Sequence, residues 1–282
     1  MENNMRILIA FILSSSFLFS QVKTPQPSPF STITQVVGIT EIAIEYCRPG
    51  IKGRKIFGGL EPYGKVWRTG ANEATKIKFS TDVTLEGNEV PAGEYSIYTV
   101  PGEREWKIII NKKLDGRQNH AKEHDLVTFK VKPKLTPLPV ERFTIDIADI
   151  TDNSANIVLM WAQTRVSFKM GVDTDKMVME SIKNFRDSDD EKSAGAWYSS
   201  ARYYFENEKN LEEALEMVSK SLEINEKPFW VLRLKSQILA AKGDYEEAIV
   251  WAKRSLVSAQ KAGNNTYIKM NETAISEWSA KL

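Results

Sequence analysis

The sequence predicts a mainly-β sandwich or barrel domain followed by an all-α domain of helical hairpins. Three observations support this fold class. β-branched and aromatic residues alternate with polar ones over residues 32–170, the apolar spacing becomes helical after Gly171, and the helical part repeats itself at an interval of 34 residues. We therefore divide the chain into a signal peptide (1–20), a β-sandwich-like domain (21–170), a linker or helix (171–192) and helical repeats (193–282).

The first twenty residues are typical of a secretory signal peptide. Arg6 precedes an apolar run from Ile7 to Phe19, and Ser20 supplies a small residue for cleavage before Gln21. The run is shorter than the roughly twenty residues that a membrane-spanning helix needs. We expect export to the periplasm or the extracellular space, and a soluble protein without a membrane span after cleavage near Ser20.

Composition excludes several classes of partner and of covalent stabilisation. The chain has 38 basic and 37 acidic residues, a balance that recommends neither nucleic acid nor a membrane surface as a partner. Cys47 is the only cysteine, so no internal disulfide can form and burial must hold the fold together. No cofactor-binding pattern occurs, and we expect no cofactor.

The β domain is predicted from short alternating segments separated by glycine, proline and asparagine. Residues 40–46, 75–79 and 143–147 alternate strictly, and about nine or ten strands fit between residues 32 and 170. Gly87-Asn88 is typical of a hairpin turn. Because no helical pattern separates the strands, a sandwich or barrel is favoured over a parallel sheet.

The helical domain is predicted from self-similarity. Ala214 and Ala248 lie 34 residues apart within matching segments, and the serines Ser221 and Ser255 have the same offset. These residues, together with the Gly243-Asp-Tyr245 turn, resemble the tetratricopeptide repeat, in which a small residue lets the two helices of a hairpin pack closely. The resemblance implies a concave surface that docks a peptide or protein. Residues 267–278 are expected to form a capping helix.

The segment from Arg48 to Thr75 is the best candidate for a ligand site. Residues 46–75 contain six glycines and two prolines, and basic residues outnumber acidic ones. Such a segment suits an anionic or sugar-like ligand, since glycine lets the backbone approach a ligand and arginine matches carboxylate or phosphate oxygens. An equally physical interpretation is a rigid loop held by Phe57 and Trp67, with Arg68 paired to Glu73 or Glu45. The ligand-binding candidates are Arg48, Lys52, Arg54, Tyr63, Trp67, Arg68, Asn72 and Glu73.

The same segment resembles the signature of a family of exported bacterial proteins, the domain of unknown function numbered 2911. The matching pieces stand at residues 46–49, 52–54, 56–58, 62–64 and 67–75, and the resemblance extends over about residues 29–170. Cys47 replaces the usual serine, and the Trp-Gly and Tyr elements expected after Asn111 are missing. The resemblance implies a β domain and export, without an established activity.

A second motif, His120-Ala-Lys-Glu-His124, has the residue order of one class of zinc peptidase. That chemistry needs both histidines on one helix and a third ligand, whereas these residues lie between two predicted strands. We therefore expect a polar surface loop and no metal.

These patterns predict a non-catalytic exported protein that docks a peptide or protein partner on its helical repeats. The β domain would act as a scaffold or bind an anionic or sugar-like ligand. The alternative is an exported hydrolase acting on glycan or peptide, with Arg68, Asn72 and Glu73 as acid/base and charge-stabilising groups. No catalytic residues can be named, and the patterns favour a protein that is not an enzyme over one that is.

Overall fold

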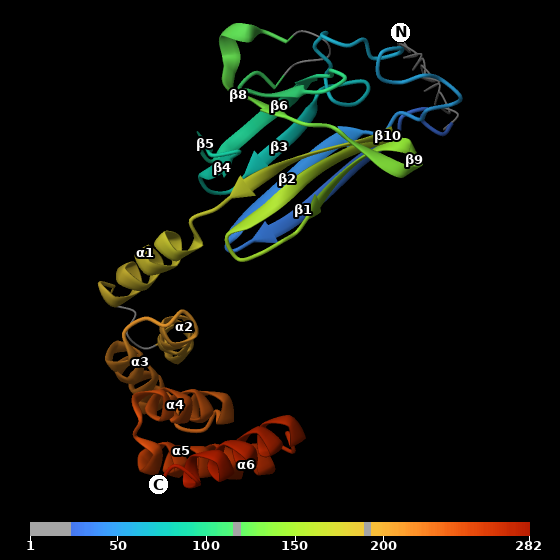
Figure 1. Cartoon of the computed structure of the whole chain (residues 1–282). Helices are drawn as coiled ribbons and strands as arrows, with labels where there is room; N and C mark the ends of the chain where they lie inside the picture. The colour runs from blue at the N-terminus through green and yellow to red at the C-terminus, as the bar shows by residue number, and fades with distance from the viewer. Residues whose placement is uncertain (1–23, 115–119, 189–192) are drawn as a thin grey trace, which may run out of the picture. The chain divides into compact units, whose positions relative to one another are not determined.

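The computed structural model describes residues 24–114, 120–188 and 193–282. The chain divides into two compact units, Met1–Thr174 and Asp175–Leu282, which we call the β unit and the α unit and describe separately (Figure 1). The predicted signal peptide lies outside the described residues.

The described residues of the β unit form ten strands in two antiparallel sheets, which confirms the predicted class. The sheets do not close on each other, so of the two predicted architectures the barrel is wrong. The six-stranded sheet has the order β1 (Phe30–Val37), β2 (Thr40–Cys47), β3 (Thr75–Phe79), β6 (Gly93–Val100), β7 (Trp106–Asn111) and β8 (Asp125–Val131). The four-stranded sheet has the order β5 (Asn88–Val90), β4 (Val83–Leu85), β10 (Ser154–Gly171) and β9 (Lys134–Ala148).

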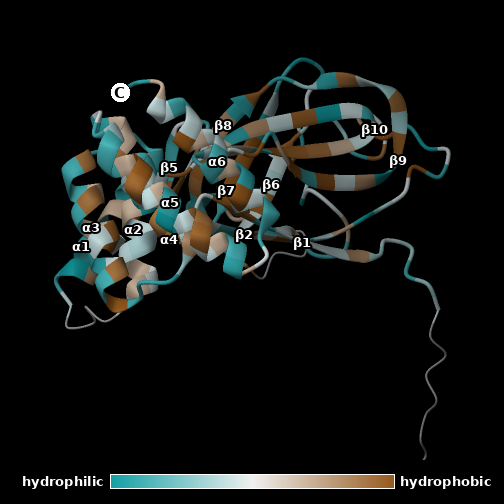
Figure 2. Cartoon of the chain, turned by 90° about the horizontal axis from the view of Figure 1, so that it is seen from below, coloured by the Kyte–Doolittle hydropathy of each residue, from teal (hydrophilic) through white to brown (hydrophobic). Residues whose placement is uncertain are grey.

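Side-chain alternation explains why these segments form half-buried strands. In β2, the side chains of Ile42, Ile44 and Tyr46 are buried, and Glu41 and Glu45 are exposed. Successive residues of a strand point to opposite faces, so the apolar set enters the core together. The same succession of apolar and polar residues is visible along other strands (Figure 2).

Aromatic contacts between the two sheets form the core of the β unit. Tyr46 of β2 packs edge-on against Phe143 of β9, and Phe129 of β8 packs against Phe168 of β10, at ring-centroid distances of 5.8 and 5.4 Å. The Tyr46 hydroxyl also donates to the carbonyl of Ile145 and accepts from its N–H, at 3.2 and 3.0 Å. A strand of each sheet is thereby fixed against the other.

The predicted hairpin turn is present with its centre shifted by one residue. Glu86 and Gly87 form the two-residue connection, with φ of 47° and 81°, and Asn88 already belongs to β5. Positive φ at both central positions is the geometry that matches the twist of the flanking strands. The Asn88 side chain closes the turn by donating to the carbonyl of Leu85 at 3.0 Å.

In its described residues the α unit consists of six helices packed in antiparallel pairs. Aliphatic and aromatic side chains of helices α1, α2, α3 and α4 form one shared core. The helices are α1 (Thr174–Arg186), α2 (Ala194–Glu206), α3 (Leu211–Ile224), α4 (Phe229–Lys242), α5 (Tyr245–Lys261) and α6 (Asn265–Ser279). No helix in this part of the chain, or elsewhere among the described residues, is long and apolar enough to cross a membrane.

Helix boundaries in the α unit follow from capping residues. Asn210 accepts hydrogen bonds from the N–H groups of Glu212 and Glu213 at the start of α3, and Ser193 caps α2 in the same way. Gly243 ends α4 with a φ of 91°, a left-handed conformation that costs glycine little. The turn between α4 and α5 therefore lies at the predicted position.

Small residues allow the hairpins to pack closely. Ala214 and Ala248 are fully buried, and both lie in the first turns of the second helix of a hairpin. Ser221 donates to the carbonyl of Ala194 at 2.8 Å, and Ser255 donates to that of Phe229 at 2.7 Å. Each serine thus ties the second helix of a hairpin to the start of the first, which gives the 34-residue offset a structural meaning.

Candidate functional site

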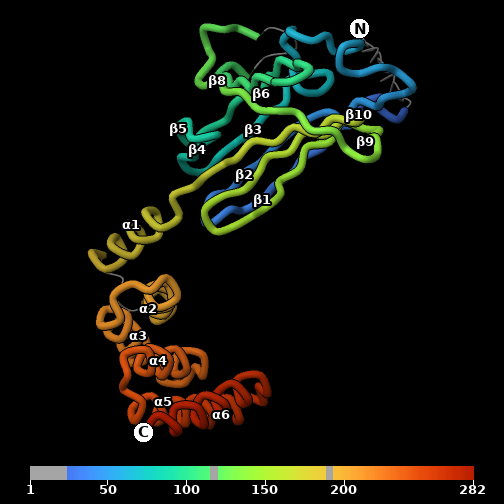
Figure 3. The backbone as a smooth tube through the Cα atoms, viewed as in Figure 1, coloured from blue at the N-terminus to red at the C-terminus, as the bar shows by residue number. Residues whose placement is uncertain are grey.

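The signature segment joins β2 to β3 and lies folded against both sheets. It runs as a blue-to-cyan coil at one end of the strands (Figure 3). Isolated bridges pair Gly50 with Arg142 of β9 and Trp67 with Thr99 of β6. Residues far apart in sequence therefore hold the segment at both ends, which satisfies backbone groups that a long loop otherwise leaves to water.

Trp67 is a core residue at the centre of this segment. Its side chain is 4% exposed, and its indole N–H donates to the carbonyl of Gly70 at 3.0 Å. The ring stacks on Trp161 at 5.7 Å and 20°, and it meets Phe57, Trp106 and Phe143 edge-on. Burial of this ring stabilises the loop and both sheets together, and leaves no face for a ligand.

Arg48 and Arg54 use their guanidinium groups to hold the backbone. Arg48 donates to the carbonyl of Phe143 at 3.1 Å and to the hydroxyl of Thr144 at 2.7 Å. Arg54 donates to the carbonyl oxygens of Ile51 and Gly50 at 3.0 and 2.7 Å. Both arginines therefore have a structural role, whether or not a ligand also reaches them.

Tyr63 lies against Gly58 on the outside of the segment. Gly58 has a φ of 74°, and a Cβ atom there would approach Tyr63 Cε2 to 2.6 Å, so a larger residue would strain the backbone and push the Tyr63 ring aside. The tyrosine side chain is 40% exposed to solvent. It is the aromatic candidate whose geometry still suits contact with a sugar or peptide.

The exposed candidates are dispersed along the segment. Lys52 is exposed, and its backbone N–H donates to the carboxylate of Glu141 at 3.1 Å. Asn72 and Glu73 lie on the turn before β3, where the Asn72 amide points to the thiol of Cys47 at 3.4 Å.

Arg68 and Glu61 form the most unusual electrostatic environment of the segment. Both are half-buried, and the Nε atom of Arg68 is buried without a hydrogen-bond partner among the described residues. Burial raises the pKa of Glu61 to about 7, although the positive charges of Arg68 and Arg54 oppose the rise. A carboxyl that titrates near neutral pH beside an unsatisfied guanidinium donor is a feature that binding sites share.

Glu61 was not among the predicted site residues. In the sequence it counts only as one of a few acidic residues in a basic segment, and nothing local indicates burial. The parallel bridge between Phe57 and Glu61, formed when the loop folds back on itself, places the carboxyl. Within the segment, the structure brings Glu61 close enough to Arg54 and Arg68 for their charges to act on its carboxyl.

A family model described as "Protein of unknown function (DUF2911)" matches residues 28–170, just over half of the chain. The chain belongs to this family. A search of curated proteins returned no match. The match covers the strands and the signature segment, so the segment's geometry belongs to the DUF2911 domain, and the six helices follow it.

The paired histidines of the DUF2911 domain do not share a helix. Lys122–His124 is a single 3₁₀ turn, and His120 instead contacts Asp125, with Nε2 and Oδ1 2.7 Å apart. The amide of Asn111 donates to the same carboxylate oxygen at 2.8 Å. No group of three His, Cys, Asp or Glu side chains in the described part of the chain is placed to hold a metal ion.

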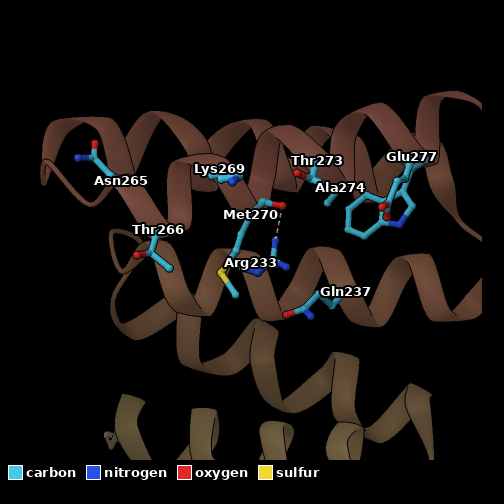
Figure 4. Close-up of a pocket in the computed structure, with 10 residues that line it drawn as sticks. Arg233, Gln237, Asn265, Thr266, Lys269, Met270, Thr273, Ala274 and Glu277 are labelled. Carbon is cyan, nitrogen blue, oxygen red and sulfur yellow. Dashed lines mark hydrogen bonds between the residues drawn. The ribbon is translucent and has the colours of Figure 1, made fainter.

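Beyond the DUF2911 domain, the α unit has a groove of about 670 Å³ between α4 and α6 (Figure 4). Its lining is Arg233, Gln237, Asn265, Thr266, Lys269, Met270, Thr273, Ala274, Glu277 and Trp278. The guanidinium group of Arg233 donates to the Met270 carbonyl at 3.1 Å and to Asn271 Oδ1 at 3.3 Å. Burial lowers the pKa of Arg233, which marks a guanidinium partly withdrawn from water.

This groove contains residues that the sequence did not identify. The helical repeats predict a docking surface without naming its side chains, since any exposed polar residue of α4 and α6 is a candidate. Met270 is 44% exposed beside the polar groups, and such an accessible thioether adapts readily to an apolar partner side chain.

Proposed function

We propose that this is an exported, non-catalytic binding protein whose helices dock a peptide or protein in the α4–α6 groove. The observation that carries the proposal is the groove itself. Amide, hydroxyl and charged groups from two helices surround the exposed Met270 side chain there. Peptides are recognised by such mixtures, because their backbone offers donors and acceptors and their side chains offer apolar anchors.

We further propose that the six helices are tetratricopeptide-like repeats. The close packing at Ala214 and Ala248, and the equivalent hydrogen bonds of Ser221 and Ser255, support one repeated unit. In stacked repeats the first helices of successive hairpins line a common surface, which here would be that of α4 and α6.

For the DUF2911 domain we propose a scaffolding role, with an anionic or sugar-like ligand at Arg54, Glu61 and Arg68. Trp67 is buried, and the guanidinium groups of Arg48 and Arg54 both hold backbone carbonyls. The donor left for a ligand is therefore Arg68 Nε, which has no hydrogen-bond partner among the described residues, and Arg54 would contribute its charge. The hydrolase alternative would use Arg68, Asn72 and Glu73, of which Asn72 and Glu73 are exposed to water. Water weakens the charge stabilisation that such chemistry requires, so binding has the stronger support.

Site-specific photo-crosslinking in the exporting cell tests this proposal. A photoreactive residue replaces Thr273 or Gln237 in the groove of the full-length protein, and Glu246 on the exposed side of α5 is the control position. We expect a discrete crosslinked product only when the photoreactive residue is at Thr273 or Gln237. Replacing the other of these two residues with Trp should fill the groove and abolish that product. The recovered protein should begin near Gln21.

Equal crosslinking from Glu246, or none from either groove position, would contradict docking in the groove. Recovery of the protein with Met1 retained would contradict export. The two parts of the proposal are thus tested in one preparation.

A further inference from the structure

A second concave surface of the α unit lies on α5 and the connection between α3 and α4. Its volume is about 810 Å³, and we call it the α5 pocket. The lining residues are Glu226, Lys227, Leu232, Lys253, Arg254, Val257, Ser258, Lys261 and Ala262. It shares no lining residue with the α4–α6 groove.

The α5 pocket is strongly basic. Four of its lining residues are cationic, and Glu226 is the one acidic residue in the described lining. An excess of three positive charges stands out in a chain whose basic and acidic residues almost balance. A local surplus of this kind attracts an anionic partner even where the whole molecule does not.

The cations of the pocket have no carboxylate partner among the described residues. Elsewhere in the α unit, Lys209 pairs with Asp175 and Lys242 pairs with Glu212, at 2.8 and 2.9 Å. Arg254 instead lies over the ring of Trp251, 4.2 Å from its centroid. That contact holds the guanidinium in place.

The pocket also has an apolar part. Leu232 is buried within it, and Val257 is 49% exposed. Val250 is 55% exposed and precedes Val257 by two turns of the same helix. Exposed valines interleaved with cations along one helix face indicate a surface that an amphipathic partner covers.

We propose that the α5 pocket binds an acidic segment of a partner protein that also carries aliphatic side chains. Carboxylates would meet Lys227, Lys253 and Lys261, and an aliphatic side chain would contact Val257 and Leu232. Among the described residues, no aromatic side chain lines the pocket to stack on a nucleic-acid base, and its concave form does not suit a flat lipid surface. This inference goes beyond the proposed function, because it concerns a different surface and a partner of defined charge.

The test measures binding of a fluorescein-labelled peptide, Glu-Asp-Leu-Glu-Asp-Leu-Glu-Glu, to the full mature chain by fluorescence anisotropy. We expect Lys253→Glu combined with Lys261→Glu to weaken binding about tenfold or more, since two attractive contacts become repulsive. The matched control, Lys132→Glu with Lys134→Glu, makes the same charge change at exposed positions of the β unit. It should bind within about twofold of the wild type.

A version of the peptide with serine in place of leucine tests the apolar part, and should bind more weakly than the leucine peptide. The Val257→Ser variant should lose that preference. Helical circular dichroism of each variant confirms that the exposed substitutions leave the α unit folded.

Three results would overturn the inference. Wild-type protein that fails to bind the peptide, equal losses in the pocket and control variants, or indifference to leucine would each do so. Phosphatidylglycerol vesicles and a single-stranded oligonucleotide are parallel probes, and either one binding in place of the peptide would assign the surface to that partner.

A groove variant separates this test from the proposed function. Thr273→Trp in the α4–α6 groove should leave peptide binding unchanged. If Thr273→Trp abolishes binding and the α5 variant does not, the peptide occupies the groove, and the α5 inference fails while the proposed function stands.

Discussion

The β unit and the α unit are stabilised over very different distances along the chain. In the β unit, Trp67 of the signature segment stacks on Trp161 of β10, and the Tyr46 hydroxyl of β2 is hydrogen-bonded to the backbone of Ile145 in β9. In the α unit, Ser221 reaches Ala194 of the preceding helix, and Ser255 reaches Phe229. One unit depends on a single aromatic cluster assembled from remote segments, and the other on a local arrangement repeated along the chain.

This difference teaches where each unit tolerates change. An aromatic cluster that joins two sheets and a loop has no substitute, so its loss should affect the whole β unit. Each hairpin of the α unit packs mainly on its neighbours along the chain, so damage at one helix should affect the adjacent helices most. The following predictions test that contrast.

The largest effect is expected for Trp67→Ala. Removal of a buried indole leaves a cavity among Phe57, Trp106 and Trp161, and should lower the free energy of unfolding of the β unit by about 3–5 kcal/mol. Hydrogen exchange followed by mass spectrometry should show faster exchange across both sheets. The control is Trp230→Ala in the α unit, where the side chain is 41% exposed and the loss should be small. Similar losses for the two variants would remove the contrast.

An intermediate effect is expected for Ala248→Leu. The alanine is fully buried where α5 packs in its hairpin, so a larger side chain forces helices apart and should cost about 1–3 kcal/mol. Exchange should rise in α4 to α6 and stay unchanged in the β unit. Ala241→Leu, at an exposed position of α4, is the matched control and should change stability by less than about 0.5 kcal/mol. Faster exchange throughout the β unit would contradict a local response.

The smallest effect concerns Glu61 and depends on pH. Its folded pKa of about 7 lies above the ordinary value of 4.5, so the folded state holds the proton more tightly than the unfolded state. Stability should therefore fall as pH rises from 4.5 through 7. The neutral Glu61→Gln variant escapes this loss, and its advantage should reach about 1 kcal/mol by about pH 8, a value reduced for partial exposure.

Urea unfolding at about pH 5 and pH 8 measures the difference. Glu89→Gln, at an exposed position of β5, is the matched carboxylate control. The same pH dependence in both variants would argue against a special environment for Glu61. It would also weaken the case for a ligand at Arg54 and Arg68.

Local patterns explain how much of the fold was predictable. Alternation at Ile42, Ile44 and Tyr46 predicts a strand because its period follows from backbone geometry alone. The offset between Ala214 and Ala248 predicts hairpins because a repeat needs the same small residue at each interface. The choice between two sheets and a closed barrel was not predictable, since closure depends on which remote strands pair.

The candidate site was predictable only as a segment. The sequence identified residues 48–75 as dense in glycine and arginine, and it described Arg48, Arg54, Arg68 and the other candidates alike. The partners that separate them, such as the carbonyl of Phe143 for Arg48, belong to strands far along the chain. Spacing within the segment holds no information about those partners.

By itself, the sequence determined the two-part fold class, the family signature and the repeated hairpins, because each depends on the types and spacing of residues that are close together in the chain. Only the tertiary structure decided that Trp67 belongs to the core, that Glu61 lies half-buried beside Arg68, and that four cations of the α unit surround one pocket. Burial and charge proximity depend on distances through space, and those distances are set when remote segments pack together.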